Sequence, residues 1–178
     1  MTLTPKPSDF EARCNATYEA LMWALSRPGL IRDLPAEGQA QIVDALIDRE
    51  CSVHAADPDL ADLAVRSGAA RVAIDRADHV FLSDLQQTAQ LKALNLGSDL
   101  HPENGATLVL NADLTDGQRL RLTGPGVDGT LDVTVGGLPK GIWPERARVM
   151  RYPMGFEMFL VDGARVMGLP RSTQVEVL

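Results

Sequence analysis

The sequence lacks any apolar run that approaches the ~20 residues of a membrane-spanning helix. Its first seven residues, MTLTPKP, also lack the apolar segment of a secretory signal peptide. These two absences predict a cytoplasmic protein without a membrane partner. There are only two cysteines, Cys14 and Cys51, and neither belongs to a Cys-x-x-Cys pair. Because both are flanked by helix-like sequence, we expect two small, buried, hydrophobic side chains and no disulfide.

Lysine is scarce, and acidic residues are in excess. The chain holds 17 basic and 24 acidic residues, which gives a net charge of −7. This balance argues against nucleic acid as a partner, because phosphate neutralisation needs basic clusters. Five arginines nevertheless gather near the C-terminal end: Arg146, Arg148, Arg151, Arg165 and Arg171. They favour either an anionic partner or a set of ordinary solvated side chains.

Length and composition predict one folded domain over residues 1–178, with a mobile tail at 1–7. The chain has 178 residues, of which 45% are hydrophobic, as in an average globular protein. Ser8 and Glu11 form a capping box, and apolar residues behind it recur at three- and four-residue steps. Periodicity and breakers predict helices over residues 8–26, 40–48, 57–68 and 83–95, with an interrupted helix inside 138–150.

Short β-branched stretches and turn residues predict the strands. We expect strands over residues 71–74, 79–82, 106–110, 118–123, 130–135, 156–161, 164–169 and 173–177. The turn at 115–117 pairs 106–110 with 118–123 as a hairpin, and Asp162-Gly163 predicts a second hairpin. Together the elements predict an α/β fold: a single domain with a mixed sheet of about five to seven strands, covered by helices.

A glycine pattern G-x-G-x-x-G is present at Gly124, Gly126 and Gly129. A dinucleotide-binding loop of this kind must follow a strand and open a helix, but the following TLDVTV is typical of a strand. The pattern therefore favours a glycine-dependent turn over NAD binding. The GGLPKG stretch around Lys140 lacks the G-x-x-x-x-G-K-[ST] order of a nucleotide-binding P-loop.

Catalytic and metal-binding patterns are equally weak. His54, His79 and His101 lie 25 and 22 residues apart without a partner at ligand spacing, which favours ordinary histidines over a metal site. Cys51 and His54 would share a face only on a helix, and no third group orients them. We assign no catalytic residue and no metal.

Two polar stretches leave an enzymatic alternative open. Glu103 lies just before a predicted strand, and Arg171 follows another within Pro-Arg-Ser-Thr. An arginine beside two hydroxyls could bind a phosphate or a carboxylate, although such residues also form plain turns. The alternative is a stand-alone enzyme for a small anionic substrate, with a pocket near these two residues.

Five segments of the chain carry recognisable motifs: ALSRPGLI at 24–31, PENGATLVL at 102–110, LRLTGPG at 120–126, YPMGFEMFL at 152–160 and LPRSTQVEV at 169–177. Together and in this order they resemble the PhnH family, whose members are components of the bacterial phosphonate carbon–phosphorus lyase core complex. Three positions depart conservatively from the family pattern: Tyr152 replaces Phe, Glu157 replaces Asp and Ser172 replaces Thr. Residues 51–97 match weakly.

The resemblance implies an accessory, non-catalytic subunit with a fold like that of pyridoxal-phosphate-dependent transferases, but without the cofactor. It implies a homodimer that joins subunits G, I and J, in a complex that forms ribose 1-methylphosphonate 5-triphosphate from a phosphonate and ATP. A chain with two cysteines cannot hold the iron–sulfur cluster that cleaves the carbon–phosphorus bond. Of the lysines Lys6, Lys92 and Lys140, only Lys140 is placed suitably for a Schiff base, and no phosphate-binding cluster accompanies it.

The resemblance also supplies the candidate interaction residues, because they lie inside the matching segments. They are Arg27, Pro28, Gly29, Glu103, Gly105, Arg121, Gly124, Gly126, Pro153, Gly155, Pro170 and Arg171.

Overall fold

A seven-stranded mixed sheet forms the centre of the protein in a computed structural model that describes residues 6–178. Residues 1–5 of the predicted mobile tail lie outside the described residues. The strand order is β1 (Arg32–Asp33), β9 (Arg165–Leu169), β8 (Glu157–Asp162), β5 (Thr107–Asn111), β4 (His79–Leu82), β2 (Ser52–Ala55) and β3 (Ala70–Arg71). The run from β8 to β3 is parallel, whereas β9 and β1 are antiparallel to their neighbours. The predicted α/β fold with a mixed sheet is confirmed.

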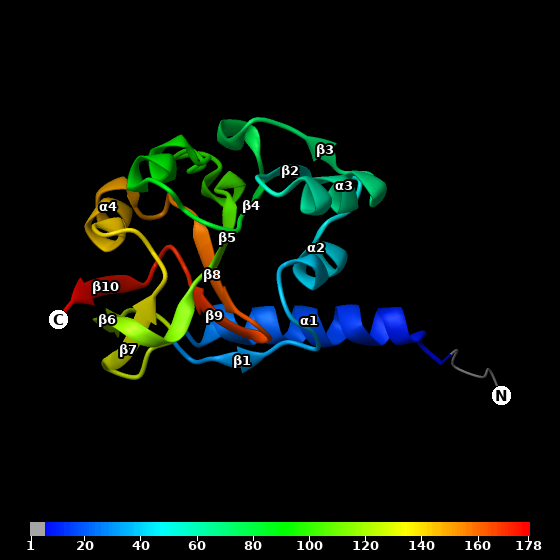
Figure 1. Ribbon diagram of the computed structural model, residues 1–178. Helices are drawn as coiled ribbons and strands as arrows, with labels where there is room; N and C mark the ends of the chain where they lie inside the picture. Colours follow the sequence, from blue (N-terminus) through cyan, green and yellow to red (C-terminus); the bar gives the residue numbers. More distant parts are fainter. Residues whose placement is uncertain (1–5) are drawn as a thin grey trace.

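Three helices cover one face of this sheet: α1 (Asp9–Ser26), α2 (Ala40–Leu46) and α3 (Pro58–Arg66) (Figure 1). The capping box of Ser8 and Glu11 opens α1 as predicted, and Asp57 caps α3. Gly168 on β9 lets the backbone of α1 approach closely, because an added Cβ would lie 2.6 Å from Ala24. The alternating side chains of the central strands bury Phe81, Val109 and Phe159 against these helices.

A second, three-stranded antiparallel sheet covers the opposite face. It has the order β10 (Gln174–Val177), β6 (Asp113–Thr123), β7 (Leu131–Gly136), and α4 (Ile142–Val149) packs beside it. Its apolar side shares one core with the central sheet, where Leu120 and Leu122 are fully buried. The expectation that helices cover both faces is therefore corrected on this side.

The predicted hairpin between residues 106–110 and 118–123 is wrong. β5 already has the parallel neighbours β4 and β8 on its two edges, so no edge is free for a returning strand. The chain instead passes into β6, which pairs with β7 and β10. A register shift between Asp113 and Gln118 takes the place of the predicted turn.

Two predicted elements differ in type. The predicted α-helix over residues 83–95 is replaced by a shorter 3₁₀ helix, η2 (Thr88–Ala93). Leu91 within η2 and Leu94 just after it are both buried. Three-residue spacing suits this tighter helix. Residues 71–74 are divided between β3 and a second 3₁₀ turn, η1 (Ile74–Arg76). A third such turn, η3 (Pro102–Asn104), precedes β5.

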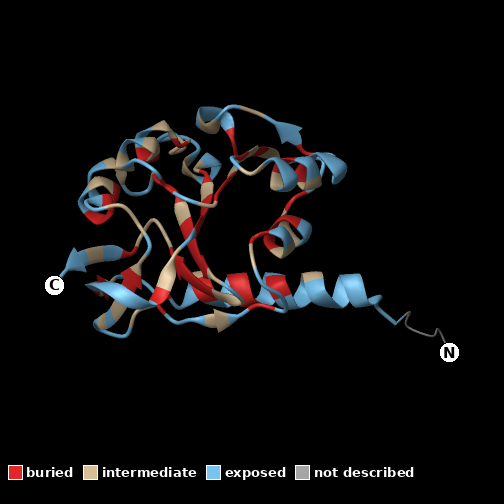
Figure 2. Cartoon of the chain, viewed as in Figure 1, coloured by how far each residue is buried: buried red, intermediate tan, exposed pale blue. Residues whose placement is uncertain are grey.

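Strands β1 and β2 were not predicted. The helix-like interpretation around Cys51 is wrong, because the following residues form a buried parallel strand between β3 and β4. The hairpin of β8 and β9 around Asp162-Gly163 is confirmed. Burial follows this layering, and the N-terminal half of α1 extends beyond the body of the protein as an exposed segment (Figure 2).

Candidate functional site

Several candidate residues from separate segments converge around an ion pair between Arg171 and Glu157. The Nε atom of Arg171 lies 2.5 Å from Oε1 of Glu157, and its backbone N–H donates to Oε2 at 2.8 Å. The Nη1 atom also donates to the carbonyl oxygen of Pro102. Both side chains are largely buried, with exposures of 15% and 21%. The arginine therefore ties the chain after β9 to the start of β8 and to η3.

Two glycines make room for this ion pair. A Cβ atom on Gly105 would collide with the carbonyl of Gly155 and lie 3.0 Å from Nη1 of Arg171. Gly155 has a φ of +149°, and a Cβ there would meet Met150 and Arg171. The carbonyl of Pro153 lies 3.5 Å from the same guanidinium nitrogen. These candidates are thus brought together as a tightly packed junction.

A second junction joins the turn after α1 to the loop between β6 and β7. A Cβ atom on Gly126 would lie 2.5 Å from the carbonyl oxygen of Ser26 and 2.8 Å from Pro28. Gly29 has a φ of +85°, and a Cβ atom added to it would lie 2.6 Å from Cδ1 of Leu122. The loop with the G-x-G-x-x-G pattern leads into strand β7 and not into a helix, as predicted.

The remaining candidates make polar contacts with other residues. Glu103 is exposed and pairs with His101 at 3.0 Å; a hydrogen bond from its own backbone N–H lowers the pKa of Glu103, and the bond with His101 lowers it further. Arg121 pairs with Asp132 on the exposed side of the small sheet, with Nε and Oδ1 2.8 Å apart. Pro170 accepts a hydrogen bond from Arg146 through its carbonyl.

A pocket of about 720 Å³ opens between α4, the loop 170–173 and β10. Arg171 lines it, but Glu103 does not, so the structure does not bring the two residues of the enzymatic alternative into one pocket. Trp143, Met150 and Tyr152 form apolar walls, and the rest of the lining is Pro125, Arg146, Ala147, Ser172, Thr173, Gln174 and Val175.

Arg146 is the unexpected residue of this pocket. It is only 2% exposed and donates to the carbonyl oxygens of Thr173 at 2.9 Å and Pro170 at 2.7 Å. Desolvation lowers the pKa of Arg146 to about 10, opposed by the charge of Glu157, so the guanidinium stays protonated at neutral pH. Among residues 6–178, no acidic side chain lies within ion-pair distance of it.

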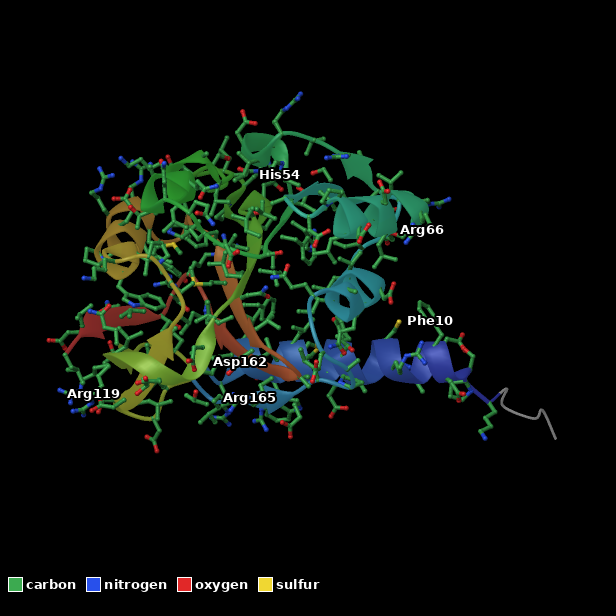
Figure 3. All side chains as sticks on the ribbon, in the orientation of Figure 1. Phe10, His54, Arg66, Arg119, Asp162 and Arg165 are labelled. Carbon is green, nitrogen blue, oxygen red and sulfur yellow. The ribbon has the colours of Figure 1, made fainter. Side chains whose placement is uncertain are left out.

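The other four arginines of the C-terminal group each have an acidic partner. Arg148 pairs with Glu145, Arg151 with Asp99, Arg165 with Asp162, and Arg171 with Glu157. Asp162 and Arg165 point toward one another at the tip of the β8–β9 hairpin (Figure 3). The count of arginines in this window was visible in the sequence, but which of them is buried without a carboxylate depends on tertiary contacts.

The histidines lie in separate environments, and Cys14 and Cys51 are free thiols that are only partly buried, which corrects the burial expected for them. His79 and His54 occupy neighbouring strands, where His79 is opposite Val53, so the two rings point to different faces of the sheet. Nδ1 of His54, which is labelled in Figure 3, contacts the carbonyl of Val72 at 3.2 Å. In the part of the chain that the structure describes, no group of three or more His, Cys, Asp and Glu side chains could hold a metal ion.

The outer face of α1 carries large apolar side chains in solvent. Tyr18, Met22 and Trp23 are 51%, 55% and 47% exposed, while the opposite face of the same helix is buried against the sheet. Trp23 also contacts the guanidinium of Arg32, 5.4 Å from the ring centroid. Phe10 is exposed at the projecting end of the helix (Figure 3). Clustered exposed apolar side chains of this kind mark interaction surfaces.

The features that the described residues offer for binding are the two motif junctions, the pocket beside Arg146 and the exposed apolar face of α1. None of the helices among residues 6–178 combines the length and apolar character needed to cross a bilayer.

Comparison with known proteins identifies the family of the chain. The family model described as "Bacterial phosphonate metabolism protein (PhnH)" matches residues 7–176. A relative from Stutzerimonas stutzeri named "Putative C-P lyase subunit protein HtxG" is 32% identical over 177 residues, which covers 93% of this chain and 87% of the relative. The chain therefore belongs to the PhnH family, as the five sequence segments predicted.

Proposed function

We propose that the protein is an accessory, non-catalytic subunit of the carbon–phosphorus lyase core complex and acts by binding its neighbours in that assembly. The observation that carries this proposal is the relative HtxG, named a C-P lyase subunit, which aligns with 93% of the chain. We further propose that the protein binds subunits G, I and J of the complex and that it does so in the cytoplasm. The reaction of the assembly is then formation of ribose 1-methylphosphonate 5-triphosphate from a phosphonate and ATP.

The outer face of α1 supports this role, and we assign the docking of another core subunit to it. Tyr18, Met22 and Trp23 line a surface hollow of about 480 Å³ together with Glu19, Ser26 and Arg27. Aromatic residues, methionine and arginine are the side chains enriched in the centres of protein interfaces. Since the opposite side of α1 already packs on the sheet, a partner would bury the helix on both sides.

Co-purification tests the proposal. The tagged chain is co-expressed with subunits G, I and J, and the recovered subunits are quantified. The wild-type chain is expected to recover all three, whereas Met22→Asp loses at least one, because a carboxylate would be desolvated at the interface. The matched control is Val65→Asp, which introduces the same charge at a half-exposed site on α3.

Recovery of the wild-type chain alone, with turnover of a small anionic substrate by that chain, would contradict the subunit role and favour the enzymatic alternative. Equal loss of partners in Met22→Asp and Val65→Asp would contradict the assignment to α1. Light scattering on the isolated chain tests the proposed homodimer, with twice the chain mass of 19.2 kDa expected.

The proposed relation to pyridoxal-phosphate-dependent transferases, without the cofactor, is tested separately. Lys92 lies 3.7 Å from Glu145, and Lys140 lies in the turn before α4. Incubation with pyridoxal phosphate followed by borohydride reduction is expected to give no stoichiometric adduct in the mass spectrum. A full adduct abolished by Lys140→Ala, and kept in Lys92→Ala, would show that a cofactor site exists.

A further inference from the structure

We propose that the pocket between α4 and β10 binds a small organic phosphate or phosphonate, with Arg146 as the charged residue of the site. This proposal concerns the isolated chain and goes beyond the assembly role. Arg146 is buried and charged, and the hydrogen bonds that it donates all go to neutral backbone carbonyls. The carboxylate of Glu157 is beyond ion-pair distance of Arg146 and is already paired with Arg171. Backbone carbonyls satisfy hydrogen bonds without cancelling a charge, and a buried uncompensated charge is costly to a fold.

Two residues that line the pocket also carry buried hydrogen-bond donors that are not used. The Nε atom of Arg146 and the Oγ1 atom of Thr173 are both buried without a hydrogen-bond partner in the described structure. A buried donor that stays unpaired destabilises the fold, because it has lost its hydrogen bonds to water without a replacement. Both residues line the pocket, so an oxyanion in it would offer acceptors for N–H and O–H donors from two different elements.

The rest of the lining agrees with an anion. Ser172 and Gln174 add neutral polar groups, Arg171 adds a second guanidinium, and none of the residues that line the pocket among those described is acidic. Glu157 balances Arg171 from outside the lining, which leaves the charge of Arg146 in excess. Donors that converge from a helix, a loop and a strand suit the three oxygens of a tetrahedral group better than the two of a carboxylate.

The pocket walls define the rest of the ligand. Trp143, Met150 and Tyr152 present apolar and aromatic surface beside the polar end. A volume of about 720 Å³ exceeds what an inorganic ion fills and lies in the range of small-molecule sites. The ligand class is therefore a phosphate or phosphonate group joined to an apolar or flat substituent.

The experiment uses the isolated full-length chain and three probes that share one ring: phenylphosphonate, phenyl phosphate and benzoate. Binding is followed by titration calorimetry and by fluorescence. In a Trp23→Phe background, Trp143 is the remaining tryptophan and reports on the pocket. We expect saturable binding of one or both phosphorus compounds, with a change in Trp143 emission, and at least tenfold weaker binding of benzoate. The two phosphorus probes distinguish an ester from a phosphonate ligand.

Two variants test the assignment to Arg146 and its pocket. Arg146→Gln is expected to abolish binding, but it also removes hydrogen bonds to the loop. Gln174→Glu keeps those bonds and places a carboxylate in the lining, so we expect at least a tenfold loss. Gln118→Glu adds the same charge at an exposed position of β6 and is expected to bind as the wild type does.

Absence of saturable binding by both phosphorus probes would overturn the proposal. Equal binding of benzoate would overturn the preference for a tetrahedral group. Unchanged affinity in Gln174→Glu would place the bound probe elsewhere. Because no partner subunit is present, these outcomes are independent of the co-purification result.

Discussion

Arg171 holds both oxygens of the Glu157 carboxylate, one through Nε at 2.5 Å and the other through its backbone N–H at 2.8 Å. Two segments that resemble the PhnH family thereby meet at one ion pair, whose two residues lie 14 positions apart in the chain. The same guanidinium reaches the carbonyl of Pro102 in a third such segment. These motif residues therefore share a structural role, which is to hold three separate segments of the chain together.

Neutralising the carboxylate tests that role. Glu157→Gln leaves the largely buried Arg171 without a counter-charge, and we expect the free energy of unfolding to fall by about 2 kcal/mol, below the value for a fully buried pair. Urea unfolding monitored by circular dichroism measures the change. Asp132→Asn, which breaks the exposed pair with Arg121, is the control and should cost less than about 1 kcal/mol. Equal losses would mean that the Arg171 pair is no more important than a surface pair.

Gly105 is expected to be coupled to this ion pair. Gly105→Ala places a methyl group against the carbonyl of Gly155 and 3.0 Å from Nη1 of Arg171. The backbone of Gly105 has a φ of −62°, so the cost is steric overpacking of about 1–3 kcal/mol and not conformational strain. Since the methyl group displaces the arginine, Gly105→Ala and Glu157→Gln should be non-additive in a double-mutant cycle.

Gly163→Ala provides the comparison for this cycle. Gly163 has a φ of +58° at the tip of the β8–β9 hairpin and nothing within 4 Å of its Cβ position, so its cost is conformational. The losses of unfolding free energy caused by Gly163→Ala and by Glu157→Gln should therefore be additive within about 0.5 kcal/mol. Additivity in both cycles would show that Gly105 does not act through Arg171.

Local signals explain which elements could be predicted from the sequence. Ser8 and Glu11 specify the start of α1, and Asp162-Gly163 specifies the β8–β9 hairpin, because both are formed by residues adjacent in the chain. The partner of a strand is a different matter. The sequence of residues 118–123 does not indicate that they join a second sheet, because this outcome depends on β4 and β8 occupying both edges of β5. Strand β2 was missed because its sequence, SVHA, has only one β-branched residue and no apolar run, whereas the equally short β4 has the apolar run VFL.

The candidate site shows the same division. Arg171 and Gly105 could be found because they lie in segments that resemble a family. Arg146 lies between two of these segments, and in the sequence it is one of five arginines in its window. Its burial follows from the loop 170–173 closing over α4, which no local pattern encodes.

The thiol of Cys51 is expected to react slowly. Burial raises the pKa of Cys51, and the nearby carboxylates of Asp48 and Asp78 raise it further. In a Cys14→Ala background, the rate of labelling by a disulfide reagent should reach half its maximum above pH ~8.5, the ordinary thiol value. Asp48→Asn should lower that midpoint. Rapid labelling near neutral pH would make Cys51 a candidate nucleophile again.

The buried position of the His79 imidazole leads us to expect that the free energy of unfolding depends on pH. Burial lowers the pKa of His79, and the charges of Asp78 and Asp48 oppose this effect only in part. Its Nδ1 atom is buried without a partner, so protonation would create an N–H that has no acceptor. The unfolded chain binds this proton at an ordinary pKa of about 6.5, while the folded protein does not. The free energy of unfolding should therefore decrease as pH falls below about 6.5, until the lower folded pKa is reached.

Urea unfolding at pH 7.5 and at pH 5.5 measures this dependence. One histidine contributes a slope of at most about 1.4 kcal/mol per pH unit. His79→Gln removes the titrating group, so the difference between the two pH values should shrink relative to the wild type. His101→Gln, at a ring whose side chain is 64% exposed, is the matched control and should keep most of the difference. If His79→Gln retains the full wild-type difference, the proton that destabilises the fold binds elsewhere, and the buried imidazole of β4 is not the pH-sensitive group.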